Sequence, residues 1–296
     1  MAAGSSRTDP AALLLRWLRS QAAPDALAWL EDQLEILLRG DGNQKLFIAM
    51  GLVSRRFAKT ELRLGEDDLA SASRARAGWD PSGWSPADAA RVVLLTELSR
   101  RQSDFAAVFR DLCRSADVSE AVAFYRGLPL YQRHAELEAQ AAEGARSNMQ
   151  SVFEAVAHRN PYPRECFDEP RWNQMILKAL FISSELAPIQ GLDERSNPRL
   201  AAMLCDFAHE RWAAGRSVSP ELWRCVGPFA DEAVIADMKR LFDKGTAQDR
   251  QAAVLALSSS PHPAAKSLLE AHRDLARQVA SGALTWERVM SHAEPA

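Results

Sequence analysis

Two stretches of the chain, RDLCRSADVSEAVAFYRGL at residues 110–128 and KRLFDKGTAQDRQAAVLAL at residues 239–257, align without a gap. Each reads as a helix, a capped turn and a second helix, and the acidic residues Glu120 and Asp249 coincide in the alignment. Helix pairs of this kind are the unit of HEAT-like solenoids, in which each pair buries its apolar face against its neighbours. We therefore predict an all-α single domain over residues 1–296, built of stacked antiparallel helix pairs, either as a HEAT-like α-solenoid or as an irregular helical bundle.

Helices are expected along nearly the whole chain. Ala and Leu are abundant, aromatic residues make up 7%, and runs of β-branched residues are scarce, so no strand is expected. Several helix starts carry capping residues, as at Ser85 before Pro86, at Ser219 before Pro220, and at Thr246. The expected helices span residues 9–20, 25–39, 43–58, 66–76, 86–100, 102–115, 118–128, 131–158, 169–186, 196–214, 219–243 with a break near 227–228, 247–258 and 262–281.

Two connections interrupt the helical pattern with Pro, Gly and Asn: AGWDPSGWS at residues 77–85 and RNPYPRECFD at residues 159–168. In the first, Trp79 and Trp84 either cover an end of the solenoid or present an exposed adhesive surface. In the second, NPYP at residues 160–163 predicts a rigid stop, because the residue before each proline is pushed towards extended geometry.

Composition and charge exclude several classes of protein. The formal net charge is −3 and the pI is about 6.1, so no net field attracts nucleic acid or an anionic membrane. The cysteines lie at least 20 residues apart without a C-x-x-C pair, which argues against a zinc knuckle or a disulfide framework, and only Cys166 falls in a polar loop. The first apolar run is five residues long and ends at Arg16, too short for a signal peptide, and no run is long enough to span a bilayer. We expect a cytoplasmic protein.

Familiar catalytic motifs are absent from the sequence: it contains no G-x-G-x-x-G, Walker A, G-x-S-x-G or H-E-x-x-H pattern. Asp206, His209 and Glu210 can share one helix face, and Glu154 lies four residues before His158, which is a spacing that metal ligands use. Carboxylate-bridged helical bundles, however, need paired Glu-x-x-His units, which the chain lacks. We expect no metal and no cofactor.

The polar connection at residues 159–168 leads into a clean amphipathic helix. Asp168 offers an N-cap, and Asn173 and Lys178 lie off the apolar stripe or at its border. A buried amide needs hydrogen-bond partners. Asn173 therefore has two possible roles, one in stabilising the fold and one in binding a ligand or partner. The apolar stripe consists of Trp172, Met175, Ile176, Ala179 and Leu180.

The central region resembles the EboA family. The resemblance is carried by EGARSNMQSVFEAVAHRNPYP (143–163), WNQMILKALF (172–181), GLDERSNPRLAAMLCDFAHERWAAGRSVSPELWR (191–224) and VGPF (226–229). Residues 143–229 form the most family-specific block, and the rest is similar only in its alanine-rich helical character. The resemblance implies a bacterial protein that takes part in the traffic of secondary metabolites or their precursors. It supplies no catalytic residue and no cofactor to transfer.

Two functions of different classes remain open. The first is a non-enzymatic scaffold or carrier that docks other proteins of the metabolite-trafficking pathway, or a small-molecule metabolite, on a concave surface. The second is an enzyme of unrecognised type that acts on that metabolite. The residues expected to bind the ligand or partner are Asn173, Lys178, Asp193, Arg195, His158 and His209.

The loop GLDERSNP at residues 191–198 is the expected centre of this site. Asp193, Glu194 and Arg195 are three charges that no core requires. A purely structural role is the alternative, in which Asp193 caps a backbone and Arg195 pairs with Asp193 or with Glu210.

Overall fold

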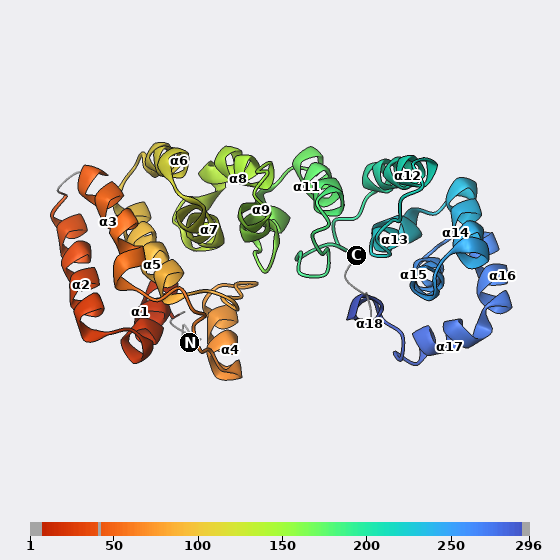
Figure 1. Cartoon of the computed structure of the whole chain (residues 1–296), viewed down its shortest axis with the longest axis horizontal. Helices are drawn as coiled ribbons and strands as arrows, with labels where there is room; N and C mark the ends of the chain where they lie inside the picture. Colours follow the sequence, from red (N-terminus) through yellow and green to blue (C-terminus); the bar gives the residue numbers. More distant parts are fainter. Residues whose placement is uncertain (1–7, 41–42, 292–296) are drawn as a thin grey trace, which may run out of the picture. The chain divides into compact units, whose positions relative to one another are not determined.

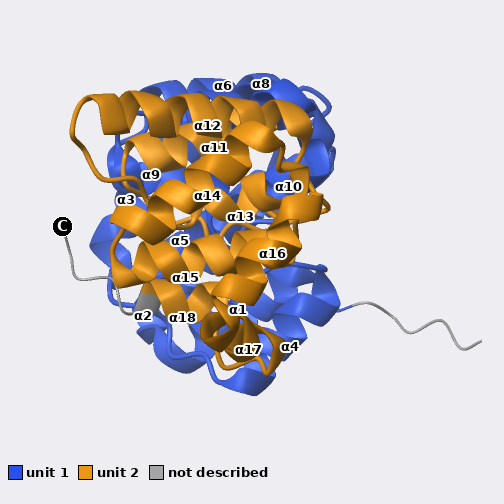
Figure 2. Ribbon diagram, turned by 90° about the vertical axis from the view of Figure 1, so that its right-hand side faces the viewer, with its two compact units in different colours: residues 1–171 blue, residues 172–296 orange. Residues whose placement is uncertain are grey.

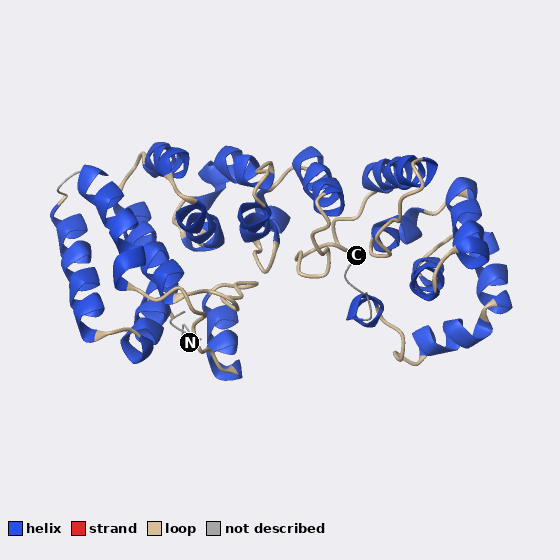
Figure 3. Cartoon of the chain, viewed as in Figure 1, coloured by secondary structure: helices blue, strands red, loops and turns tan. Residues whose placement is uncertain are grey.

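The computed structural model describes residues 8–40 and 43–291 (Figure 1). Throughout those residues the regular elements are helices, and no strand is found (Figure 3). The predicted all-α class is thus confirmed, whereas the HEAT-like arrangement stays a prediction. None of the described helices combines the length and the apolar character that crossing a bilayer needs.

The chain divides into two compact units, Met1–Arg171 and Trp172–Ala296, which Figure 2 colours separately. The expectation of a single domain over residues 1–296 stays a prediction. Unit 1 contains α1 (Pro10–Gln21), α2 (Pro24–Arg39), α3 (Asn43–Arg56), α4 (Glu66–Ala75), α5 (Pro86–Arg101), α6 (Phe105–Ser115), α7 (Val118–Arg126), η1 (Leu128–Leu130), η2 (His134–Leu137), α8 (Glu138–Ala145), α9 (Gln150–Ala157) and α10 (Tyr162–Cys166). The boundary falls within α11 (Glu169–Phe181). Unit 2 continues with α12 (Pro198–Ala213), α13 (Leu222–Val226), η3 (Gly227–Phe229), α14 (Glu232–Lys244), α15 (Ala247–Ser258), α16 (Pro263–Ala271), α17 (Arg273–Ala280) and α18 (Trp286–Ser291).

The two aligned stretches of sequence have the same local structure. In the turn between α6 and α7, Asp117 Oδ1 accepts from Glu120 N at 2.8 Å and Glu120 Oε2 accepts from Asp117 N at 2.9 Å. In the turn between α14 and α15, Thr246 and Asp249 exchange the equivalent bonds at 3.2 and 2.8 Å. Both turns are capping boxes that satisfy orphan N–H groups of the second helix. The predicted helix–turn–helix pairs are therefore confirmed.

Helix α5 forms the centre of unit 1, where it packs against α1, α2, α3 and α7. It is buried around nearly its whole circumference, and even Arg91 is fully buried. Burial lowers the pKa of the Arg91 guanidinium. The guanidinium donates to Met50 O at 3.4 Å, to Ser119 Oγ at 3.1 Å and to Ser54 Oγ at 2.5 Å. These acceptors offset the cost of burying the charge and join α3, α5 and α7.

The tryptophans of the loop at residues 77–85 are part of the core of unit 1. Trp79 and Trp84 are 2% and 3% exposed. Their ring centroids lie 6.0 Å apart, and Trp79 lies 5.7 Å from Trp17 of α1. Burying large aromatic rings stabilises the fold more than leaving them in water, which explains why the alternative of an exposed adhesive surface is wrong.

The single helix expected at residues 131–158 is wrong, because the structure breaks it into η2, α8 and α9. Gly144 lies near the end of α8, where an added Cβ would come within 2.8 Å of Tyr125 and Val156. Ser147 Oγ then accepts from Met149 N at 3.1 Å. Serine side chains that bond to the nearby backbone compete with helix formation, so the chain turns between α8 and α9.

The NPYP segment stops the preceding helix as expected, since α9 ends at Ala157. The expected extended geometry is wrong at Tyr162, which begins α10 with Pro161 as its N-cap at φ −72° and ψ −11°. A proline in the first turn of a helix costs no hydrogen bond, because the N–H that it lacks has no partner there in any case. The bond from Tyr162 N to Asn160 Oδ1, at 3.0 Å, supports this start.

Other helix ends also differ from expectation. The helix expected at residues 169–186 ends at Phe181, and Ser183 takes a left-handed conformation with φ 58°. The expected helix at residues 262–281 is interrupted at His272 between α16 and α17. Helix α18 was not expected; it follows a region whose apolar residues pack with those of α17.

Candidate functional site

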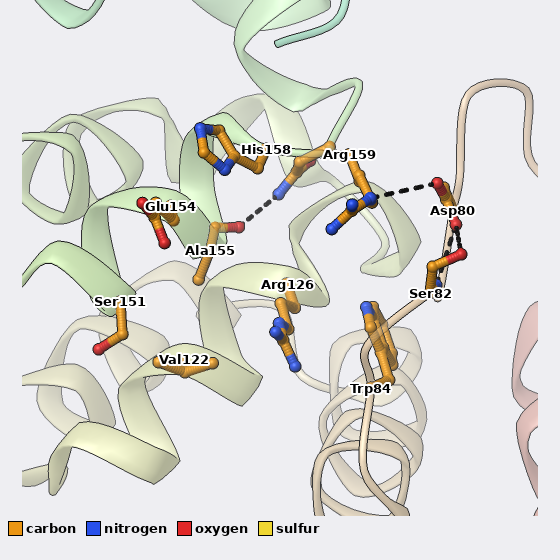
Figure 4. Close-up of a pocket in the computed structure, with 11 residues that line it drawn as sticks. Asp80, Ser82, Trp84, Val122, Arg126, Ser151, Glu154, Ala155, His158 and Arg159 are labelled. Carbon is orange, nitrogen blue, oxygen red and sulfur yellow. Dashed lines mark hydrogen bonds and ion pairs between the residues drawn. The ribbon is translucent and has the colours of Figure 1, made fainter. Parts of the chain in front are cut away.

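A small polar recess opens in unit 1 between the loop at residues 77–85, α7 and the end of α9 (Figure 4). Its volume is about 130 Å³. Pockets that enclose a whole drug-sized ligand usually measure about 300–1,000 Å³, so this recess suits one polar group of a larger ligand. Its polar lining includes Asp80, Ser82, Trp84, Arg126, Ser151, Glu154, His158, Arg159 and Asn160.

The loop at residues 77–85 has a fixed shape. Gly78 and Gly83 both have φ 76°, a left-handed conformation that glycine adopts without strain. Asp80 Oδ1 accepts from Ser82 N at 2.9 Å and from Ser82 Oγ at 2.5 Å, which closes the turn between the two glycines. The loop thereby places Trp84 at the wall of the recess, with its indole nitrogen turned towards the interior (Figure 4).

Two arginines lie at the same end of the recess as Trp84 (Figure 4). Arg126 ends α7, and its Nη1 donates to Gly83 O and to Asp88 Oδ2, both at 2.9 Å. Arg159 follows α9 with φ 50°, and its guanidinium makes one long ion pair of 3.8 Å with Asp80. The left-handed backbone at Arg159 is uncommon for a residue with a side chain and is a form of local strain.

Asn160 fixes the segment that follows α9. Its Nδ2 donates to Tyr125 O and to Ala155 O, both at 3.0 Å, and the residue is 3% exposed. Glu154 and His158 lie on the other side of the recess from Trp84 (Figure 4). His158 is thus the predicted site residue that lines this recess.

The predicted loop at residues 191–198 lies in unit 2 and is tied to its surroundings. Asp193 accepts from Arg224 in a bidentate ion pair, with distances of 2.6 and 2.7 Å. The guanidinium of Arg195 lies over the ring of Trp172, 4.8 Å from the ring centroid. Asp193 and Arg195 therefore each have a contact that stabilises the loop, with Arg224 and Trp172 respectively.

Asn173 has the structural role that a buried amide requires. It is 1% exposed and exchanges hydrogen bonds of 3.2 and 2.9 Å with the side chain of Asn197. Asn197 in turn caps α12 by accepting from Leu200 N at 2.9 Å. Lys178 is half-buried on the same helix as Asn173.

His209 pairs with Asp237 across α12 and α14. Its Nε2 lies 2.9 and 2.8 Å from the two carboxylate oxygens. Burial raises the pKa of the Asp237 carboxyl, and the hydrogen bond from His209 partly opposes that shift. Beside the pair, the guanidinium of Arg240 lies over Trp212 at 4.3 Å. The imidazole of His209 therefore lies against the Asp237 carboxylate, and its ring centroid is 5.8 Å from that of Trp212.

The six predicted residues are divided between the units. His158 belongs to unit 1, and the other five belong to unit 2. Asn173 and Arg195 meet at Asn197, whose Nδ2 also donates to Arg195 O at 3.1 Å. His209 belongs instead to the pair with Asp237. A binding role for these six residues stays a prediction.

The cysteines have the character of buried thiols. Burial raises the pKa of Cys113 and Cys205 to about 12 and that of Cys225 to about 11, and it also raises the pKa of Cys166. Such thiols stay protonated near neutral pH and are poor nucleophiles. Among residues 8–40 and 43–291, no three His, Cys, Asp or Glu side chains gather in a way that could hold a metal ion.

Sequence reasoning missed most of the recess. Arg126, Arg159 and Trp84 come from three segments that are far apart along the chain, and no spacing rule connects them. The available signals were local: a Gly/Pro turn at residues 77–85, and polar residues directly after the apolar helix that ends at Ala157.

The comparisons with known proteins give one result. No curated protein and no solved structure matches the chain. A family model described as "Metabolite traffic protein EboA" matches residues 11–227, which include the recess and the loop at residues 191–198. The match begins far upstream of the block at residues 143–229 that carries the resemblance in sequence. Because it spans well over half of the chain, the chain belongs to the EboA family.

Proposed function

We propose that the chain is a non-enzymatic carrier or scaffold in metabolite traffic, and that the recess of unit 1 holds a polar group of its cargo. The observation that carries the proposal is the recess itself, which is polar, open to solvent and set into rigid elements. The family description supports the connection with metabolites. The proposal places the chain beside other proteins of a secondary-metabolite pathway in a bacterial cytoplasm.

Several titratable side chains are already paired with other residues or kept protonated by burial, which favours a binding function over a catalytic one. Asp193 is held by Arg224 and His209 by Asp237, and the thiols are kept protonated by burial. A catalytic acid or base needs to reach a reacting atom, and a nucleophile needs a thiolate or an adjacent base. The pair of His209 and Asp237 is the arrangement that an enzyme would use most readily for acid–base chemistry. The alternative function is therefore an enzyme that uses this pair to act on the metabolite.

The proposal is tested by capture of small molecules from native cells. Ser151 is exposed at the recess, so Ser151→Trp fills the recess without disturbing the core. Ser73→Trp, on the exposed side of α4, is the matched control. We expect mass spectrometry to find one or more small molecules enriched on the wild-type protein and on the control, and to find them lost from Ser151→Trp.

Two further experiments distinguish a carrier from an enzyme, and the recess from the loop at residues 191–198. The purified protein is incubated with the captured molecule, whose mass stays unchanged for a carrier and changes for an enzyme. In the second arm, Lys178→Ala, Asp193→Ala and Arg195→Ala test the loop at residues 191–198. If they abolish capture while Ser151→Trp retains it, the cargo site lies at that loop and the assignment to the recess is wrong.

A further inference from the structure

One end of the recess in unit 1 presents an indole N–H that has no acceptor in the described part of the chain. Trp84 is 3% exposed, and no described residue accepts a hydrogen bond from its Nε1, which is open to solvent, unlike the buried indole nitrogens of Trp79, Trp172 and Trp223. The nitrogen faces the recess (Figure 4). An indole N–H that opens into the recess is satisfied by water, which an acceptor of a ligand can replace, so this donor is available to a ligand.

Arg126 adds further donors beside the indole. Both N–H groups of its Nη1 are used, one on Gly83 O and one on Asp88 Oδ2. A guanidinium carries five N–H donors, so three remain on Nε and Nη2, and no described residue accepts from them. The contacts at Nη1 hold the side chain in place, which leaves the other edge of the guanidinium in a fixed orientation.

Arg159 completes the group from the opposite wall. Among the described residues, its guanidinium has one ion pair, of 3.8 Å with Asp80, which is too long for a hydrogen bond. Its side chain is 53% exposed, so it is free to turn towards a ligand. The three donor side chains come from the loop at residues 77–85, the end of α7 and the residue pair after α9.

The nearby carboxylates already have donors from the protein. Asp80 Oδ1 accepts twice from Ser82, and Asp88 Oδ2 accepts from Ser85 N at 2.8 Å as well as from Arg126. Glu154 lies at the other end of the recess (Figure 4). The end formed by Trp84 and the two arginines therefore has an excess of unused donors, although the chain as a whole is negatively charged.

We propose that Trp84, Arg126 and Arg159 form a subsite for an oxyanion group, a carboxylate or a phosphate, on the cargo. The inference rests on the proposed function, because it names the chemistry of the group that the recess holds. Arginine recognises both anions through paired N–H donors, and an indole N–H adds a third donor of fixed direction. The volume of about 130 Å³ accommodates either group.

The test uses the full chain with acetate, inorganic phosphate and chloride as sodium salts at constant ionic strength. The readout is the ¹H–¹⁵N signal of the Trp84 indole, assigned by its disappearance in Trp84→Phe. We expect a saturable shift with acetate or phosphate and none with chloride. The anion that binds more tightly identifies the group, and the absence of a saturable shift with both oxyanions overturns the proposal.

Arg133 supplies a matched control for Arg159. Both are exposed arginines of unit 1 with left-handed backbone, φ 53° and φ 50°, but Arg133 donates to Ser103 O and does not line the recess. We expect Arg159→Gln to weaken oxyanion binding about tenfold and Arg133→Gln to leave it unchanged. Equal weakening by both substitutions would show a general effect of charge and would reject the subsite.

The test of the oxyanion subsite and the test of the carrier function can succeed or fail independently of each other. If native small molecules are captured in the recess while acetate and phosphate do not bind, the carrier proposal stands and the oxyanion subsite is wrong. If the oxyanions bind through Arg159 while no small molecule is captured from cells, the subsite stands and the carrier proposal is wrong.

Discussion

At the scale of single residues, Asn160 shows how one side chain fixes the site. Its amide joins Tyr125 O, Ala155 O and Tyr162 N in three hydrogen bonds of 3.0 Å. We expect Asn160→Ala to leave these buried groups unpaired and to lower the free energy of unfolding by roughly 2–3 kcal/mol. Urea unfolding measures the loss. Lys59→Ala, at an exposed position, is the control, and an equal effect of the two substitutions would contradict the prediction.

Glu221 gives a residue-scale prediction about pH. Its carboxylate is 2% exposed and accepts from Leu186 N and Ala187 N, both at 2.8 Å. Burial raises its pKa above the ordinary value of 4.5, more than the two N–H donors lower it. The folded state therefore binds this proton more tightly than the unfolded state. The stability contributed by the proton is complete below pH 4.5 and is lost as the pH rises through the higher, folded-state pKa.

The substitution Glu221→Gln removes this titration and keeps an oxygen that can accept from one of the two N–H groups. We expect the stability of the wild type relative to Glu221→Gln to fall as the pH rises from 4.5 towards neutrality. Urea unfolding at several pH values measures that difference, and Glu210→Gln, at an exposed position on α12, is the control. A difference that rises with pH would refute the assignment.

Single residues also show why the site could be predicted only in part. The need of Asn173 for a partner follows from its place beside an apolar stripe, and the structure supplies Asn197. His158, a predicted binding residue, lines the recess, but its binding role stays a prediction. The chemistry of Arg126 depends on contacts with Gly83 and Asp88, which are about 40 residues away in sequence, and a single sequence carries no signal for such contacts.

At the scale of elements, the local sequence indicates where helices start more accurately than where they are interrupted. Capping residues at Ser85 and Thr246 mark α5 and α15, because a side chain that bonds to the nearby backbone acts within its own turn. The break after Gly144 depends on packing against Tyr125 and Val156, which the sequence does not display. Helix α10 was missed because two prolines within four residues indicated a loop, although a first helical turn accepts proline.

Gly227 gives a prediction at the scale of packed elements. It joins α13 to η3, and a Cβ added there would lie 2.4 Å from Ala256 O of α15. Because the obstructing atom belongs to the backbone, the helices must shift apart. We expect Gly227→Ala to lower the free energy of unfolding by about 1–3 kcal/mol. Chemical unfolding measures the change, with Gly65→Ala as the control, since nothing lies within 4 Å of a Cβ at Gly65. Similar losses for both would reject the packing argument.

At the scale of the whole molecule, the family match and the division into units do not coincide. The match covers residues 11–227, so it includes unit 1 and continues through α12 and α13. The boundary between the units falls within α11, at Arg171 and Trp172. The sequence pattern of the family is therefore not confined to one unit, and the expectation of a single domain stays a prediction.

The continuity of α11 leads to a prediction about cooperativity. Its first turn belongs to unit 1, where Asp168 Oδ1 accepts from Arg171 N at 2.9 Å, and the buried Trp172 and Asn173 belong to unit 2. Backbone hydrogen bonds four residues apart cross the boundary, so unfolding of one unit frays a helix of the other. We expect calorimetry to show one thermal transition, which Asn160→Ala in unit 1 and Gly227→Ala in unit 2 both lower, by about 2–4 °C per kcal/mol. Two transitions, each lowered by only one of the substitutions, would show that the units unfold independently and that the single-domain prediction is wrong.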